Sequence, residues 1–189
     1  MPDQIKVMMI NPNPRTMSLV QPTVALFYSI LRENGIEMRF FDTTFYDTSE
    51  FYADTEKYTE ITLSVPRLIE AKPKELSSMK TMVHLLQDFR EELESFCPDV
   101  LLVSAMESTI TFARDMLRAV RDLAIPHVLG GVFATSSPEL AISYDEFDVI
   151  CVGETENVLV SLVQRLANGD KVSGLPGLWQ KNKDGSIER

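Results

Sequence analysis

Residues 5–10 read Ile-Lys-Val-Met-Met-Ile, a nearly continuous apolar run that is closed by Asn11-Pro12-Asn13-Pro14. A strand buried on both faces and ended by turn residues has this pattern. Apolar residues then recur at helical spacing over 24–31, and Gly35 stands where a helix would end. The beginning of the chain therefore predicts a strand and a helix, the repeating unit of an α/β fold.

The same alternation continues along the chain. Short apolar stretches predict strands near 37–42, 99–104, 126–130 and 148–152, and Ser137-Pro138 is typical of a short helix start. Apolar stripes predict three longer helices, carried by Met82, Leu86, Phe89, Leu93 and Phe96, by Ile110, Ala113, Leu117, Val120 and Ala124, and by Leu159, Leu162, Val163 and Leu166. Short connections and right-handed crossovers then predict a flavodoxin-like (Rossmann-like), doubly wound, five-stranded parallel sheet of order 2-1-3-4-5.

Two segments depart from this pattern. Residues 43–75 mix aromatic residues with acids and threonines without a steady period, which indicates an insertion. It is either a surface excursion anchored by its aromatics or a lid or docking surface. The last residues predict a C-terminal β-hairpin around Lys183-Asp184-Gly185. We therefore expect one domain over residues 1–170 and a hairpin or linker over residues 171–189.

Composition limits the classes of function. The net charge of −10 argues against a nucleic-acid partner, because binding to phosphate backbones depends on clustered Lys and Arg. The chain has no apolar run of the roughly 18 residues that a membrane span needs, and no secretory signal. Two cysteines are too few for a disulfide framework, so we expect a cytoplasmic protein.

Catalytic and metal patterns are weak. His84 lies in a helical stretch and His127 begins a buried strand, so both are interpreted as structural. Cys97 resembles a helix end and Cys151 a core residue, and their spacing does not suit a metal site. We therefore expect no catalytic residue and no metal ligand from this chain.

Ligands of a doubly wound sheet bind at the carboxyl ends of its strands. Glycines at positions 130, 131 and 153 stand there, and they would let a large flat ligand approach the backbone. Alternatively, Gly130-Gly131 is only a tight turn and Gly153-Glu154 only a helix start capped by Thr155. Other classes of protein with this fold do not match the sequence. A receiver domain needs acidic residues where Asn11 and Ser104 stand, and the motifs of dinucleotide-binding and Walker-type nucleotide-binding proteins are missing.

Three stretches together resemble the N-terminal cobalamin (B12)-binding domain of cobalamin-dependent radical SAM proteins. They are VLGGVFATSSPELAI (128–142), DVICVGETENVLVSLVQRL (148–166) and GLPGLWQKNKDGSI (174–187). In that family a Gly-Gly, a Pro-Glu and a Gly-Glu-x-Glu recur in this order. The resemblance spans almost the whole chain.

The resemblance implies that the corrin ring lies on the carboxyl edge of the sheet, with its nucleotide tail in a slot between the first and third strands. The residues expected to bind it are Asn11, Pro12, Ser104, Ala105, Met106, Glu107, Ser108, Gly130, Gly131, Val132, Phe133, Ala134, Thr135, Gly153 and Glu154. The wider cobalamin fold carries Asp-x-His-x-x-Gly after the first strand, and its His ligates cobalt. This chain has Asn11 to Arg15 there, so we expect a base-off cofactor without a protein His ligand, its lower face open or covered by Met106, Glu107 or Ser108.

Family members of this kind carry a further domain with Cys-x-x-x-Cys-x-x-Cys, which does not occur before Arg189. S-adenosylmethionine and a 4Fe-4S cluster are therefore expected only in a longer parent enzyme, which would move a methyl group or rearrange a substrate radical. The isolated domain would be inactive. Two alternatives stay open: a cofactor-free interaction domain, or a domain in which binding is lost, for example because Phe133 crowds the corrin.

Overall fold

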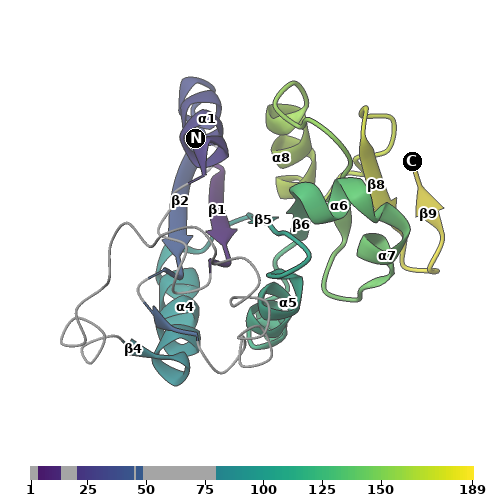
Figure 1. The fold of residues 1–189 in the computed structure, drawn as a ribbon. Coiled ribbons are helices and arrows are strands. Elements are labelled where there is room, and N and C mark those ends of the chain that lie inside the picture. Colours follow the sequence, from purple (N-terminus) through teal and green to yellow (C-terminus); the bar gives the residue numbers. More distant parts are fainter. Residues whose placement is uncertain (1–3, 14–20, 45, 49–79) are drawn as a thin grey trace, which may run out of the picture.

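The computed structural model describes residues 4–13, 21–44, 46–48 and 80–189. They form one seven-stranded sheet with helices on both faces, and a small two-stranded sheet beside it (Figure 1). The strands of the main sheet are β1 (Lys6–Asn11), β2 (Glu37–Asp42), β5 (Val100–Ser104), β6 (His127–Gly130), β7 (Val149–Cys151), β8 (Leu178–Lys181) and β9 (Ile187–Glu188). The helices are α1 (Pro22–Glu33), α4 (Met82–Phe96), α5 (Ile110–Arg118), α6 (Val132–Ser136), α7 (Pro138–Ser143) and α8 (Leu159–Ala167), with a 3-10 turn at Arg121–Leu123.

The strand order is β2-β1-β5-β6-β7-β8-β9, and the first five strands are parallel. The prediction of an α/β domain with a mostly parallel sheet is confirmed. The sheet has seven strands rather than five, because β8 pairs antiparallel with β7 and β9 pairs antiparallel with β8. β8 thus covers the free edge of the three-residue strand β7, whose unpaired backbone groups would otherwise be exposed.

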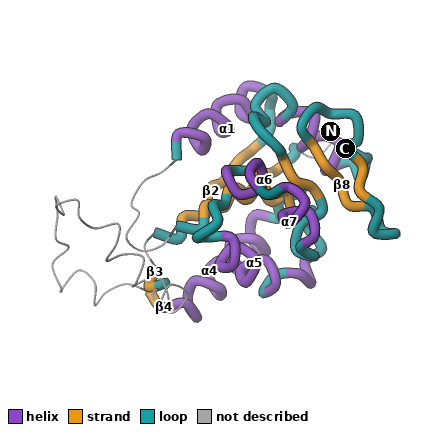
Figure 2. The backbone as a smooth tube through the Cα atoms, turned by 45° about the vertical axis from the view of Figure 1, so that its right-hand side comes forward, coloured by secondary structure: helices purple, strands orange, loops and turns teal. Residues whose placement is uncertain are grey.

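The core lies in two layers, one on each face of the sheet. Alternate side chains of a strand point to opposite faces, so Met9 and Leu102 pack with α1 and α8 whereas Ile10 and Val103 pack with α4, α5 and α7. Figure 2 shows the same arrangement, with α1 on one side of the strands and α4 and α5 on the other. The space between α1 and α8 on their shared face positions the site described below.

Three local expectations need correction. The helix predicted to continue to Ala124 ends at Arg118, and Ala124 is exposed with a left-handed φ of 53°. On α4, Leu85 is fully buried, whereas Leu86, which was predicted to lie on the apolar stripe, is only half-buried. Val132–Ser136 forms the short helix α6, which is not among the helices predicted above; the positive φ of Gly131 turns the chain directly into it.

The predicted insertion at 43–75 falls mostly outside the described residues. Its near end is described: β3 (Tyr46–Asp47) pairs in parallel with β4 (Lys80–Thr81), which immediately precedes α4. Thr43 is buried there, and its hydroxyl accepts a hydrogen bond from the Asn13 backbone N–H at 2.8 Å. This contact ties the loop after β2 to the loop after β1.

Candidate cofactor site

A cavity of about 570 Å³ opens at the carboxyl ends of β5, β6 and β7, between α1 and α8. Ligand sites commonly have volumes of roughly 300 to 1,000 Å³ and occur at this edge of doubly wound sheets. Thr23 and Phe27 contribute from α1, and Leu159 and Leu162 from α8. The cavity therefore starts at the sheet edge and continues down between the two helices.

Nine of the fifteen residues expected to bind the cofactor line this cavity. They are Ser104, Ala105, Met106, Gly130, Gly131, Val132, Thr135, Gly153 and Glu154. Val132 is an apolar residue that is 67% exposed, so it presents an uncovered apolar surface at the rim. The loops after β5, β6 and β7 thus meet at one place, although they are far apart in the sequence.

The other six residues lie elsewhere. Phe133 is buried in the core on the α4 and α5 face, where its ring stacks on Tyr144 with centroids 6.1 Å apart, and Ala134 is buried as well. Phe133 therefore does not crowd the cavity. Glu107 and Ser108 are exposed in the turn before α5, and Asn11 and Pro12 are buried at the end of β1.

Asn11 carries a buried donor without a partner. Its side chain is 2% exposed, and Nδ2 makes no hydrogen bond within the part of the chain that the structure describes. An unsatisfied buried polar group costs roughly 1 to 3 kcal/mol and calls for an explanation. Asn11 ends β1 at the same edge of the sheet as the cavity, but its buried side chain does not line the cavity.

Gly131 is essential to the shape of the rim. Its φ is 91° and its ψ is −172°, a region that essentially only glycine adopts. A Cβ at this position would lie 2.8 Å from the Ala105 carbonyl oxygen and 3.1 Å from Ser104 Oγ. The missing side chain therefore brings the β5 and β6 loops together, in addition to leaving the backbone open to a ligand.

The mouth of the cavity is crossed by a hydrogen bond that the sequence did not indicate. Ser104 Oγ donates to Gln21 Oε1 at 3.0 Å, and Gln21 is the residue that precedes the first turn of α1. On the other side, the Gly153 N–H donates to Thr135 Oγ1 at 3.0 Å. The Gln21-Pro22 pair could have marked a helix start, but not the contact with Ser104.

The deep part of the cavity, which we call the slot, is apolar. Its wall is formed by the buried side chains of Met9, Leu102, Val128, Cys151, Leu159 and Leu162. Burial raises the pKa of the Cys151 thiol to about 12, although a hydrogen bond with Thr155 acts in the opposite direction. Cys151 is therefore a neutral thiol at physiological pH and not a thiolate ligand.

Both histidines of the chain lie away from this cavity. His84 closes the first turn of α4, where its Nδ1 accepts a hydrogen bond from the Thr81 N–H at 3.3 Å. His127 begins β6, and its Nδ1 lies 2.8 Å from the Glu146 carbonyl oxygen. Because that oxygen can only accept, Nδ1 carries the proton. Both contacts are structural, as the sequence suggested.

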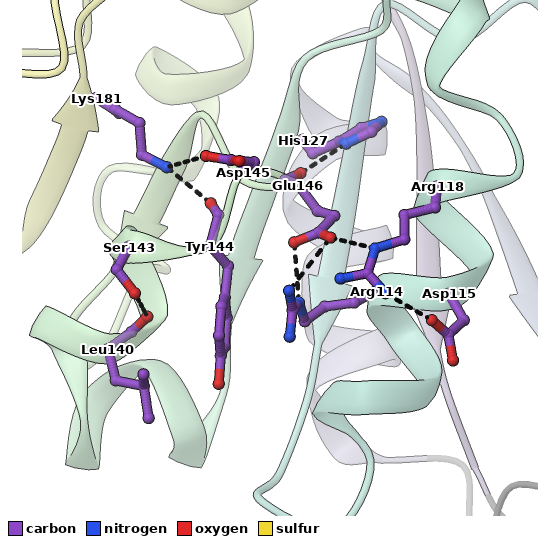
Figure 3. Close-up of polar contacts among 10 residues, drawn as sticks. All are labelled: Arg114, Asp115, Arg118, His127, Leu140, Ser143, Tyr144, Asp145, Glu146 and Lys181. Carbon is purple, nitrogen blue, oxygen red and sulfur yellow. Dashed lines mark hydrogen bonds and ion pairs between the residues drawn. The ribbon is translucent and has the colours of Figure 1, made fainter.

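A second cavity of about 660 Å³ lies around the amino end of β6. Glu146 accepts hydrogen bonds from the Nε atoms of Arg114 and Arg118, and the Arg114 guanidinium lies 3.8 Å from the centre of the Tyr144 ring (Figure 3). Burial works to raise the pKa of Glu146, but the arginine hydrogen bonds outweigh it and hold the pKa below the usual value. Asp115 pairs with Arg118 at 3.0 Å, so two carboxylates face the two arginines, and the cluster joins α5 to the loop before β7.

Neither a membrane span nor a metal cluster is found in the described part of the chain. None of its helices is both long enough and apolar enough to cross a bilayer. Within the same residues, no group of three or more His, Cys, Asp or Glu side chains could hold a metal ion.

A doubly wound α/β domain with a cavity at the carboxyl edge of its parallel strands belongs to the class of small-molecule-binding domains. A family model described as the B12 binding domain matches residues 66–163, about half of the chain. The chain belongs to this family, and its cofactor is cobalamin. The resemblance noted in the sequence is confirmed.

Solved structures of cobalamin-dependent radical SAM enzymes share the fold. The radical S-adenosylmethionine methyltransferase TsrM from Kitasatospora setae, with cobalamin and a [4Fe-4S] cluster bound, matches 98% of this chain with a TM-score of 0.65 and 19% identity. The cobalamin-dependent S-adenosylmethionine radical enzyme OxsB, with aqua-cobalamin and S-adenosylmethionine bound, matches 99% with a TM-score of 0.63 and 15% identity. The matches cover 31% of the TsrM chain and 22% of the OxsB chain, so this chain spans less than a third of either. No curated protein matches significantly in sequence.

Proposed function

We propose that this chain holds cobalamin base-off, with no histidine of its own on the cobalt. The corrin lies over the loops that follow β5, β6 and β7, and the nucleotide tail enters the slot between α1 and α8. The observation that carries the proposal is the position of the cavity relative to the two histidines. Gly130 at the carboxyl end of β6 lines the cavity, whereas His127 begins the same strand and His84 caps α4.

The nine lining residues form the proposed contact set. Gly131 and Gly153 leave the backbone open to the ring, and Ser104 and Thr135 offer hydroxyl groups to its amide side chains. Met106 lines the cavity, whereas Glu107 and Ser108 do not, so Met106 is the proposed cover of the lower cobalt face. Cobalamin itself would bring the cobalt and its methyl-transfer or radical chemistry.

Reconstitution tests this proposal. The purified chain is mixed with hydroxocobalamin, free ligand is removed by gel filtration, and corrin absorbance is expected to comigrate with the protein. The bound cofactor is then reduced to cob(II)alamin and its EPR spectrum recorded, with histidine labelled by ¹⁵N. We expect no nitrogen superhyperfine coupling. A ¹⁵N doublet would identify a protein histidine ligand, and a ¹⁴N triplet would identify the cofactor's own base, and either result overturns the base-off, His-free mode.

We also propose that the chain is the cofactor-holding part of a longer radical SAM enzyme, in which residues 171–189, whose strands β8 and β9 complete the sheet of the domain of residues 1–170, precede a following domain. The support is that TsrM and OxsB are three to five times longer than the matched region. The parent would use S-adenosylmethionine and a 4Fe-4S cluster for methyl transfer or radical rearrangement. Purified full-length protein should show iron–sulfur absorbance and reductive cleavage of S-adenosylmethionine, and this chain alone should show neither.

Two further properties are proposed. The free thiols of Cys97 and Cys151 favour a reducing, cytoplasmic location. The net charge of −10 disfavours nucleic acid as a partner. Fractionation of cells that express the tagged full-length protein tests the location, and a gel-shift assay at low salt tests the second property.

A further inference from the structure

The slot between α1 and α8 has a chemical character that limits what it can accept. Five of its six wall residues are aliphatic or thioether side chains, and the sixth is the neutral thiol of Cys151. That thiol is engaged with Thr155. Of the polar side chains that line the cavity, Ser104 and Gln21 hydrogen-bond to each other.

The wall residues are also buried. Met9, Val128, Leu159 and Leu162 are each at most 2% exposed, and Leu102 is 5% exposed. A ring that enters the slot therefore exchanges contact with water for contact with apolar side chains. An apolar ring gains from this exchange, whereas a ring with amine and aza groups loses hydrogen bonds that the wall cannot replace.

We infer that the slot selects the lower base of the cobamide, accepting apolar bases such as dimethylbenzimidazole or a phenolic ring and discriminating against adenine. The inference rests on the proposed base-off binding, because only a base released from cobalt can enter the slot. Dimethylbenzimidazole presents two methyl groups to the wall. Adenine presents an exocyclic amine and additional ring nitrogens, at least one of which would lose its hydrogen bond.

Each unsatisfied polar group costs roughly 1 to 3 kcal/mol, which corresponds to a loss of affinity of about 5-fold to 150-fold. The adenine-bearing cobamide should therefore bind at least about 5-fold more weakly than cobalamin. A cobamide with a p-cresol base should bind about as tightly as cobalamin. Cobinamide, which lacks the base entirely, should also bind more weakly because it buries no ring.

Equilibrium dialysis of these four corrinoids against the 189-residue chain measures the preference directly. If the adenine cobamide or cobinamide binds as tightly as cobalamin, the slot does not select the base and this inference fails, while cobalamin binding stands. If cobalamin binds and EPR shows base-on coordination, the base does not enter the slot and the inference fails together with the base-off mode. Failure of all four corrinoids to bind overturns the proposed function itself.

A matched pair of variants locates the selectivity. Val128→Thr places a hydroxyl of nearly the same shape in the slot wall, and we expect it to reduce the preference for cobalamin over the adenine cobamide several-fold. Val100→Thr makes the same change on the same face of the sheet, in a fully buried residue of β5 that does not line the cavity. It should leave the preference unchanged. If both variants show the same ratio of affinity for cobalamin to affinity for the adenine cobamide, the base does not lie against Val128.

Discussion

Replacing Gly131 by alanine should damage both stability and cofactor binding. Two costs add at this position. The φ and ψ of Gly131 lie in a region essentially reserved for glycine, which costs an alanine about 1 to 3 kcal/mol. The new Cβ would also lie 2.8 Å from the Ala105 carbonyl oxygen, and relieving such an overlap costs about 1 to 3 kcal/mol. The expected total is about 3 kcal/mol.

Urea unfolding of Gly131→Ala measures this loss of free energy. In thermal unfolding, a fall in Tm of about 10 °C is expected for a chain of this size. Gly35→Ala is the matched control, because Gly35 has a φ of 73° but no heavy atom within 4 Å of an added Cβ. It should cost only about 1 kcal/mol and leave cobalamin retention unchanged. If Gly131→Ala is no more destabilising than Gly35→Ala, the close approach of the β5 and β6 loops does not have the energetic role given to it here.

Three further predictions concern parts of the fold outside the cofactor cavity. Glu146→Gln should destabilise the chain by about 2 to 3 kcal/mol in urea unfolding while cobalamin retention is unchanged, because Arg114 loses a largely buried partner. Glu94→Gln removes a charge from an exposed ion pair and should cost under about 1 kcal/mol. Equal costs in the two variants would refute the distinction between the buried and the exposed ion pair. Burial lowers the pKa of His127 in the folded chain below its usual value of 6.5. The unfolded chain therefore binds a proton at a higher pH than the folded chain, and stability should fall as pH decreases below about 6.5. His127→Gln should flatten that part of the pH curve, and an unchanged slope would show that another group titrates there. Trp179→Ala should lower the free energy of unfolding by about 2 kcal/mol, because Trp179 of β8 packs against the core and pairs with Ile150. A loss of less than about 0.5 kcal/mol would mean that β8 contributes little to the stability of the sheet edge.

The sequence was sufficient where one local pattern determined the structure. The apolar run at 5–10 has no period that a helix would need, so it identified β1. The glycines at 130, 131 and 153 were correctly placed at strand ends, and all three line the cavity. These features depend on neighbours in the chain, which is why they can be recognised without a structure.

The remaining features depend on residues distant in sequence. Phe133 lies two residues after Gly131, and only the turn of α6 shows that its ring points into the core towards Tyr144. The Gln21 contact with Ser104 spans 83 positions. The position of β8 at the edge of β7 likewise arises from tertiary pairing, since a hairpin pattern does not specify which edge it joins.

The two cavities lie at opposite ends of β6, a strand of only four residues, and their chemistry explains why only one is assigned to a cofactor. At the amino end, Glu146 meets two arginines and His127 donates to a carbonyl, so the polar groups satisfy one another. At the carboxyl end, glycine turns replace side chains, and Asn11 Nδ2 at the same edge has no partner among the described residues. A site that already satisfies its own charges stabilises the fold. A site with open backbone and an apolar slot gains most from a ligand that supplies the missing contacts.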